Sequence, residues 1–457
     1  MTSSVPASES SSPASVPASP RPARRPIIVA ADMGYGHLRA ALPLAEAFGV
    51  PVLSADGPEL SSDSEREIWR RTRVFYEFTT RVSTFPWIGG PLHALVQAFT
   101  SIPHLHPWRD LSARTLGTRG LERLVAEGLG AGLIARLKAE RVPLISTFYA
   151  PALAADWAGC EDVYCVVTDS DVNRIWAPFD PARSRVRFLV PSRRAGRRLE
   201  SYGVPRRNIL FTGFPLPGEL LGGPDLGALE ANLARRLVRL DPDGSFRAEC
   251  HEEIELLLGP LPAEEERRAP LVVFTVGGAG AQATMASQIL PSVRGAVEAG
   301  RLRFALVAGL RPAVAQIFRE ALSKAGLAEG HGVEILEANG HADYFARFNR
   351  LLAGADVLWT KPSEMSFFGA LGLPVVCSAP VGVHEGYNRR WLLEAGAGLA
   401  QRDPRHTGDW LVEWLEDGTL AGAAWAGFRR LPKRGLYRIV EQLSGAPAAA
   451  GPIAAAS

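Results

Sequence analysis

The chain has 457 residues, of which 47% are hydrophobic and 21% are charged, and its formal net charge is +2. These values are typical of a soluble globular protein of two or three domains, and the small net charge argues against a general nucleic-acid binder. No run of about 20 apolar residues occurs, so the sequence predicts no membrane span. The four cysteines (Cys160, Cys165, Cys250 and Cys377) show neither CxxC nor zinc spacing, which predicts reduced thiols and a cytoplasmic protein.

Both ends of the chain have the composition of disordered tails. Residues 1–25 are rich in Ser, Pro and Ala and lack the apolar segment of a secretory signal. Residues 445–457 are dominated by Ala, Gly and Pro. We therefore expect the folded part to lie between these two segments.

Short apolar runs alternate with longer amphipathic stretches, which predicts βαβ units and mostly parallel sheets. In the first half the predicted strands are 26–32, 51–56, 143–148, 163–169, 186–192 and 209–215. Residues 216–270 are more polar and are predicted to be a helical linker region. In the second half the predicted strands are 271–278, 304–309, 333–338, 355–360 and 374–380.

This order of elements predicts an α/β protein with two doubly wound, Rossmann-like domains that face a cleft. The first domain is placed at 26–215 and the second at 271–415. Residues 416–444 are expected to form C-terminal helices, with a return to the first domain as one option. Ligands of such folds collect at the carboxyl ends of the strands.

Residues 66–110 combine arginines with many aromatic residues. These are Trp69, Phe75, Tyr76, Phe78, Phe85, Trp87, Phe99 and Trp108. One interpretation is an apolar acceptor pocket or a peripheral contact with a membrane surface. The other, which the pattern favours, is the buried face of ordinary helices.

The first strand-to-helix junction, "MGYGHLRAA" (33–41), carries a histidine after two glycines. Gly34 and Gly36 allow a ligand to approach the backbone, and His37 is either a general base or a structural residue. A dinucleotide fingerprint finds some support in Asp56, but Arg39 stands where its third glycine belongs, and no GK[ST] phosphate loop follows.

The junction "VVTDSDVNRIWAP" (166–178) places Asp169 at the end of a buried strand, facing the same cleft. Asn173, Arg174 and Trp176 are either acceptor contacts or parts of a structural turn. Asp171 is interpreted as the cap of a turn, since a DSD pair is weak evidence for a metal.

Two junctions of the second half are candidate anion sites. In "GGAGAQ" (277–282), Gly278, Gly280 and Gln282 precede a predicted helix and can form a backbone cradle. In "TKPSEMS" (360–366), Ser363 and Ser366 stand at a helix start, and Lys361 brings a mobile positive charge that suits a diphosphate.

A last junction, "PVGVHEGYNRRWLLEAGAG" (380–398), leads into a helix whose first turns carry His384, Glu385 and Asn388. Spacings of three and four residues place side chains on one helix face. Such a face can hydrogen-bond vicinal hydroxyls.

Over most of residues 26–400 these junctions resemble glycosyltransferases of the GT-B fold. The similarity is to the branch of the plant monogalactosyldiacylglycerol synthases and the bacterial lipid II GlcNAc transferase. The resemblance implies an acceptor-binding first half, with His37 as base and Asp169 nearby. It also implies that the second half holds a nucleotide-diphosphate sugar, with Glu385 and Asn388 on the donor sugar.

One position departs from that pattern. The family carries a glutamate that binds the ribose hydroxyls at the position of Phe367, and the nearest carboxylate is Glu364, one helical turn earlier. Either Glu364 replaces it, or the donor is not an ordinary ribonucleotide sugar.

The leading hypothesis is metal-independent transfer of a sugar from a nucleotide-diphosphate donor to a small-molecule or lipid-like hydroxyl acceptor, without a further cofactor. The alternatives are a nucleotide-sugar 2-epimerase, which needs several converging carboxylates, and an inactive ligand-binding relative, which Phe367 favours.

Overall fold

The computed structural model describes residues 25–31, 33–82, 101–263, 268–276, 280, 282–380 and 382–444, and within α2 it leaves out the side chains of 73–82. Residues 1–24 and 445–457 of the predicted tails, and residue Gly278, lie outside these ranges. None of the helices in the described ranges is both long and apolar enough to cross a membrane.

The first half is a six-stranded parallel sheet with the strand order β2-β1-β3-β4-β5-β6. Its strands are β1 (Ile27–Ala30), β2 (Val52–Ser54), β3 (Leu144–Ser146), β4 (Val163–Val166), β5 (Arg187–Val190) and β6 (Ile209–Phe211). Because β2 and β3 lie on opposite sides of β1, the chain reverses its direction of winding there. The carboxyl ends of β1 and β3 therefore flank the crevice where ligands of doubly wound sheets bind.

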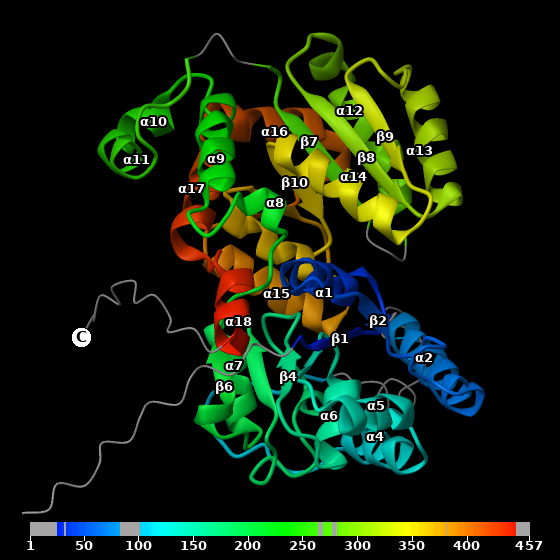
Figure 1. The fold of residues 1–457 in the computed structure, drawn as a ribbon. Coiled ribbons are helices and arrows are strands. Elements are labelled where there is room, and N and C mark those ends of the chain that lie inside the picture. Colours follow the sequence, from blue (N-terminus) through cyan, green and yellow to red (C-terminus); the bar gives the residue numbers. More distant parts are fainter. Residues whose placement is uncertain are drawn as a thin grey trace, which may run out of the picture.

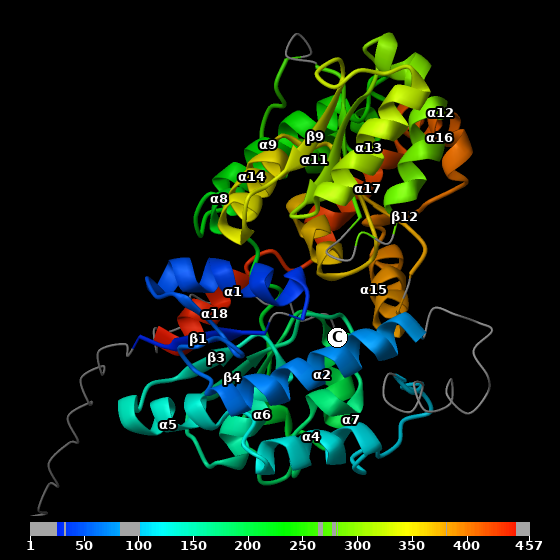
Figure 2. The ribbon, with the colours of Figure 1, turned by 90° about the vertical axis from the view of Figure 1, so that its right-hand side faces the viewer.

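Helices cover both faces of this sheet, as the figures show (Figure 1, Figure 2). They are α1 (Tyr35–Phe48), α2 (Asp63–Val82), α4 (Leu116–Ala126), α5 (Ala131–Glu140), α6 (Tyr149–Trp157), η1 (Arg174–Trp176), α7 (Arg193–Ser201) and η2 (Arg206–Asn208). Alternate strand residues enter separate cores: Ile28 and Ala30 join the cluster that includes α1, whereas Ile27 and Val29 join the cluster under α4 to α7. This period of two is what strands buried on both faces require.

The second half repeats the arrangement with the strand order β12-β11-β10-β7-β8-β9, again all parallel. Its strands are β7 (Leu271–Thr275), β8 (Arg303–Gly309), β9 (Val333–Glu337), β10 (Val357–Thr360), β11 (Val375–Cys377) and β12 (Gly398–Ala400). Its helices are η4 (Ala283–Met285), α12 (Ala286–Glu298), α13 (Pro312–Ala325), α14 (His341–Gly354), η5 (Glu364–Leu371), α15 (Val383–Glu394), η6 (Pro404–His406), α16 (Thr407–Glu416), α17 (Thr419–Arg430) and α18 (Gly435–Ser444). The reversal lies between β7 and β10, so the loop after β7 and Lys361 flank the second crevice.

The connecting region 216–270 forms α8 (Gly218–Leu221), α9 (Gly227–Arg239), α10 (Ser245–Glu249) and α11 (His251–Leu258). Helix α9 is attached to the second half, because Arg236 donates to the carbonyls of Ala355, Leu371 and Gly372 at 2.8–3.0 Å. Helix α18 crosses back and packs against α1 of the first half. The domain boundaries themselves stay predictions.

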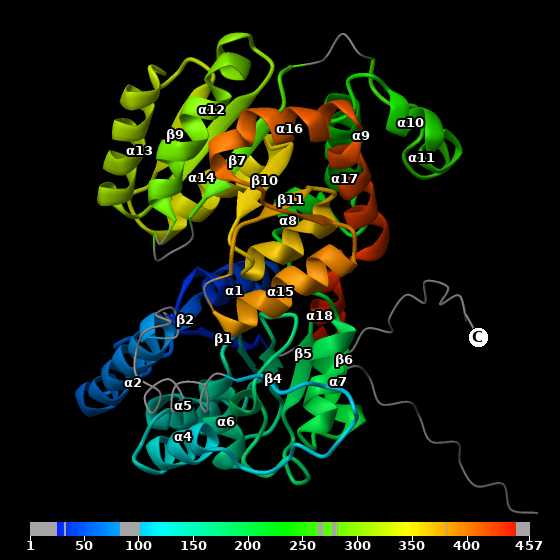
Figure 3. The ribbon, with the colours of Figure 1, turned by 180° about the vertical axis from the view of Figure 1, so that it is seen from behind.

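The two halves lie one above the other with α1 and α15 between the sheets (Figure 1, Figure 3). The predicted fold class, two doubly wound α/β halves facing each other, is confirmed. Strand β12 was not among the predicted strands.

Candidate active site

The general-base candidate, His37, lies in the first turn of α1, at the reversal point of the first sheet. Its Nδ1 is 2.7 Å from the carbonyl oxygen of Thr147, which follows β3. A carbonyl oxygen can only accept, so Nδ1 carries the proton and Nε2 carries the lone pair. This bond therefore selects the tautomer in which Nε2 can take a proton.

The pKa of His37 lies below its ordinary value of 6.5 because burial disfavours the imidazolium. The bond to Thr147 and the charges of Asp169 and Glu364 oppose that effect in part. Phe148 packs edge-on against the ring, with the centroids 4.9 Å apart. The lowered pKa favours the neutral imidazole, which is the form that can act as a base.

A cavity of about 80 Å³ opens beside His37. Its walls come from the loop after β3, the loop after β4 and the start of α15, and include His37, Phe148, Tyr149, Asp169, Asn173, Trp176 and His384. The sequence singled out His37, Asp169, Asn173 and Trp176 for this region, and they do lie together. It missed the wall made by Phe148 and Tyr149, since aromatic residues after a strand give no signal distinct from core.

Asp169 is held by a residue of the opposite half. Asn388 on α15 donates from Nδ2 to Asp169 Oδ1 at 2.9 Å and accepts from the Ser170 amide at 2.8 Å. Its amide group is fully buried. A contact between Asn388 and a donor sugar would have to use the amide hydrogen or the lone pair that these two bonds leave over, on a side chain that is buried.

Lys361 follows β10 and forms an ion pair with Glu385 of α15, with 2.6 Å between Nζ and Oε1. Glu385 Oε2 also accepts from the Gly382 amide at 3.4 Å, at the start of the same helix. The two residues predicted for the diphosphate and the donor sugar thus adjoin each other, with Lys361 still partly exposed.

The predicted diphosphate cradle is assembled from separate loops. The Gln282 side chain donates to the Ala379 carbonyl at 3.1 Å, which joins the loop after β7 to the loop after β11. The helix that Ser363 precedes is the 3-10 helix η5, and the Ser366 amide donates to the Ser363 carbonyl at 3.0 Å. Ser366 Oγ is buried and finds no partner among the described residues. Gly280 has a φ of +67°, which glycine adopts without strain.

Glu364 faces the first half instead of a free crevice. Its Oε1 is 3.3 Å from Nε of Arg39 on α1, and Arg39 also donates to the Tyr344 hydroxyl at 3.3 Å. A Cβ on Gly36 would lie 3.1 Å from Glu364 Oε2, so the absent side chain lets the carboxylate approach α1. Gly34, predicted with Gly36 on the acceptor side, precedes α1 with a φ of +119°.

Arg39 reaches into an aromatic cluster of the second half. Its guanidinium carbon lies 4.7 Å from the Phe348 ring centroid and 5.0 Å from that of Phe345. Figure 2 shows α1 below α14, which carries both rings. We call this set (Arg39, Glu364, Tyr344, Phe345 and Phe348) the Arg39 latch. These contacts account for the arginine at the position where a dinucleotide fingerprint would carry its third glycine.

Phe367 belongs to the core. It is 2% exposed and stacks on Phe214, with ring centroids 4.9 Å apart and an interplanar angle of 13°. Trp391 packs on it as well, at 5.2 Å. The position at which the resembling enzymes carry a ribose-binding glutamate therefore joins η5 to the segment after β6.

Two residues of the loop after β4, Arg174 and Asp171, are buried and bonded to other residues of the first half. Arg174, predicted on the acceptor side, is buried and donates to the carbonyls of Ser112, Ala177 and Pro178 at 2.8–3.2 Å. It does not line the cavity. Asp171, predicted to cap a turn, is instead paired with Arg198 at 2.8 Å and Arg194 at 2.7 Å.

The Asp171–Arg198 pair yields a stability prediction. Both side chains are 0% exposed, and Arg198→Met leaves the buried carboxylate with Arg194 as its remaining cation, so we expect a loss of about 2–3 kcal/mol of unfolding free energy. The matched control is Arg185→Met, whose pair with Glu161 is 70% and 79% exposed and should contribute at most about 1 kcal/mol. Urea unfolding measures both, and equal losses would contradict the prediction.

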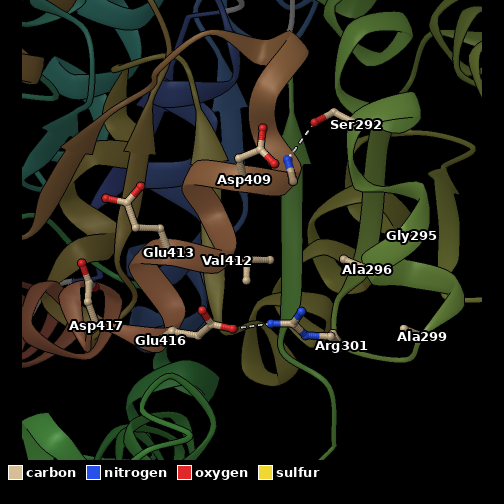
Figure 4. Close-up of a pocket in the computed structure, with 11 residues that line it drawn as sticks. Ser292, Gly295, Ala296, Ala299, Arg301, Asp409, Val412, Glu413, Glu416 and Asp417 are labelled. Atoms are coloured by element: carbon tan, nitrogen blue, oxygen red, sulfur yellow. Dashed lines mark hydrogen bonds and ion pairs between the residues drawn. The ribbon is translucent and has the colours of Figure 1, made fainter.

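A larger depression of about 700 Å³ lies elsewhere, between α12 and α16 (Figure 4). It is lined by Ser292, Arg301, Asp409, Glu413 and Glu416, and Arg301 pairs with Glu416 across it. It is open and lies at neither reversal point. The smaller cavity beside His37 holds the general-base candidate and the strand-end carboxylate, Asp169.

Within the aromatic segment 66–110, residues 83–100 and the side chains of 73–82 lie outside the described part of the structure. Of its named aromatics, Trp69 is buried and Trp108 is 52% exposed. The buried-helix interpretation holds for Trp69, and a membrane contact stays a prediction. Across the described ranges no group of three or more His, Cys, Asp or Glu side chains is placed to hold a metal ion.

Neither the protein-family models nor the curated proteins compared with the chain match it. Among solved structures, the Staphylococcus aureus MnaA–UDP co-structure is similar with a TM-score of 0.50 at 12% identity, covering 92% of this chain and 96% of that one. A UDP-GlcNAc 2-epimerase from Neisseria meningitidis bound to UDP-GlcNAc gives 0.48 at 12% identity, with 91% and 98% covered. Acinetobacter baumannii MurG gives 0.48 at 11% identity, with 92% and 99% covered. At such identities the likeness concerns architecture alone, and the chain therefore has the GT-B fold that its junctions predict.

Proposed function

We propose that the chain is a glycosyltransferase that moves a sugar from a nucleotide-diphosphate donor to a hydroxyl group of an acceptor. The observation that carries the proposal is the placement of His37, whose Nε2 lone pair is selected by the bond from Nδ1 to Thr147 and which lines a cavity together with Asp169. A hydroxyl is a weak nucleophile, and a positioned base is the usual means of activating it.

In the proposed reaction, the acceptor hydroxyl lies in the cavity and gives its proton to His37 Nε2. Its oxygen attacks the anomeric carbon of the donor sugar. The bond between that carbon and the diphosphate oxygen breaks, and its electron pair leaves with the diphosphate. Asp169 favours the imidazolium that forms, because a nearby negative charge raises the pKa of His37.

The leaving diphosphate is proposed to lie against Lys361 and the start of η5. Lys361 already forms an ion pair with Glu385, so the ammonium is held in place before the donor arrives. The amide groups of a helix start favour anions for the same electrostatic reason. The proposal needs no further cofactor, and the nucleotide sugar is a co-substrate.

A 2-epimerase, the main alternative, requires several carboxylates that are free to act on the sugar. In the described part of the chain, three of the four carboxylates around the cleft form ion pairs with basic side chains. Glu385 pairs with Lys361, Glu364 with Arg39, and Asp171 with Arg198. Asp169 is held by an amide instead. This distribution favours transfer over epimerisation.

The donor site is tested with UDP, GDP and dTDP, since a ligand that binds only the folded state raises Tm. UDP is the first choice because the MnaA structure is a UDP co-structure. We expect Lys361→Ala to weaken binding of the effective nucleotide about 10- to 100-fold, the value of a charge-assisted hydrogen bond.

The control for this prediction is Lys324→Ala, an exposed lysine on α13 of the same half, which should leave the affinity unchanged. If no nucleotide raises Tm, or if Lys361→Ala binds as tightly as Lys324→Ala, the donor-site assignment is wrong.

A further inference from the structure

Asn388 is the side chain that joins the two halves at the candidate base. It belongs to α15 of the second half, yet both of its amide atoms bond the loop after β4 of the first half. The two partners fix its orientation: the Ser170 amide can only donate, so Oδ1 faces Ser170 and Nδ2 faces Asp169. The contact is buried and involves both the nitrogen and the oxygen of the side-chain amide.

The rest of α15 supports the same docking. The Tyr387 hydroxyl donates to the Ile102 carbonyl of the first half at 3.0 Å. The Arg194 guanidinium lies 5.1 Å from the Tyr387 ring centroid, and Arg194 also holds Asp171 in the loop after β4. Figure 3 shows α15 directly above β4, β5 and α7. Docking of α15 therefore orders the loop that carries Asp169.

Asp169 acts on His37 through its charge, which favours the imidazolium. Without Asn388, the carboxylate has no partner fixed by the second half and is free to turn away from the ring. Since α15 also carries Glu385, the partner of Lys361, one helix connects the diphosphate region with the acceptor base. Helix α15 of the second half is thus in contact with both Lys361 and Asp169.

We propose that Asn388 is a positioning residue that orients Asp169 toward His37 only while α15 is docked on the first half. The acceptor side of the site is then complete only when the donor half is in place. This inference rests on the proposed function. It differs from the role that the resemblance implied, a contact between Asn388 and the donor sugar.

The test compares Asn388→Ala and Asn388→Asp with Asn349→Ala, whose side chain makes a hydrogen bond to Glu219 away from the cavity. We expect Asn388→Ala to lower kcat about 100-fold, the effect of a misplaced catalytic group, while the Kd of the nucleoside diphosphate stays within about threefold. Amide hydrogen exchange of peptides containing Ser170 should accelerate in Asn388→Ala and stay unchanged in Asn349→Ala.

Asn388→Asp separates the two hydrogen bonds. The aspartate oxygen can still accept from the Ser170 amide, so the slow exchange at Ser170 is kept, but a carboxylate now faces Asp169. Two carboxylates at this distance do not both ionise, so they share a proton or move apart, and Asp169 no longer presents its full charge to His37. The pKa of His37 should fall, and the acid limb of the kcat/KM profile should move to lower pH. A residue that only holds the halves together would lower Tm and leave kcat and this profile unmoved.

The outcomes are distinct. If the wild type is active and the Asn388 variants keep its kcat or its pH profile, the positioning role is wrong but the proposed function stands. A large increase in KM for the nucleotide sugar, with kcat unchanged, would return Asn388 to the donor site. Absence of turnover in the wild type with every nucleotide sugar would overturn the proposed function and this inference with it.

Discussion

Replacing His37 by asparagine is expected to lower kcat about 10²- to 10⁴-fold, the usual contribution of a positioned general base. The asparagine amide can still donate to the Thr147 carbonyl, as Nδ1 does, so the local structure is kept. What is lost is the lone pair of Nε2. The affinity for the nucleoside diphosphate should be unchanged, since the base lies on the acceptor side.

The pH dependence of wild type and variant checks the same residue. Burial lowers the pKa of His37, so the acid limb of kcat/KM should lie below about pH 6.5, with activity rising as the pH increases through it. The unfolded chain binds this proton more readily, so the contribution of His37 to stability is lost as the pH falls from about 6.5 through the folded-state pKa. If the acid limb persists in His37→Asn, the limb belongs to another titrating group. If this variant keeps full activity, His37 is not the general base.

Replacing Arg39 by methionine is expected to lower the free energy of unfolding by about 3 kcal/mol or more, as removal of one partner from a buried ion pair does. The Glu364 side chain is only 13% exposed, so its charge is left in a poorly hydrated position. The guanidinium also loses its contacts with the rings of Phe345 and Phe348. Urea unfolding measures the loss.

The control for the Arg39 latch is the double variant Arg39→Met/Glu364→Gln, which removes both charges. It should recover a large part of the stability, because no unpaired buried charge remains. A loss under about 1 kcal/mol in the single variant, the value of a surface pair, would show that the latch does not hold the halves together.

The fold was predictable because each strand is a short apolar run with its own boundaries. The junctions were predictable for a related reason: a side chain that follows a strand of a parallel sheet lies at the edge where ligands bind. His37, Asp169 and Lys361 were found in this way. Strand β12 was missed because its sequence, Gly-Leu-Ala, is too short for a period of two to appear.

The partners of the site residues were not predictable, because they come from distant parts of the chain. Asn388 lies 219 residues from Asp169, and Arg39 lies 325 residues from Glu364. Local spacing places such side chains on a helix face but does not identify what they meet across the cleft. The one local signal was Arg39, the single charged residue among the buried residues of α1, which otherwise are alanines, a leucine and Pro43.

Counting residues along the motif did not predict the surroundings of Phe367. Its position matches the ribose-binding glutamate of the resembling enzymes, yet the side chain packs on Phe214 in the core. Glu364, the carboxylate expected to replace that glutamate, is held by Arg39. Both residues belong to η5, which is a 3-10 helix.

The most direct test of the proposed transfer is product analysis by proton NMR. The wild type is incubated with the nucleotide sugar whose diphosphate raises Tm most, with and without a panel of hydroxyl acceptors. The proposal predicts release of the nucleoside diphosphate in step with transfer of the sugar to the acceptor or to water, and loss of this release in His37→Asn. Conversion of the nucleotide sugar into its 2-epimer, with His37→Asn as active as the wild type, would contradict it.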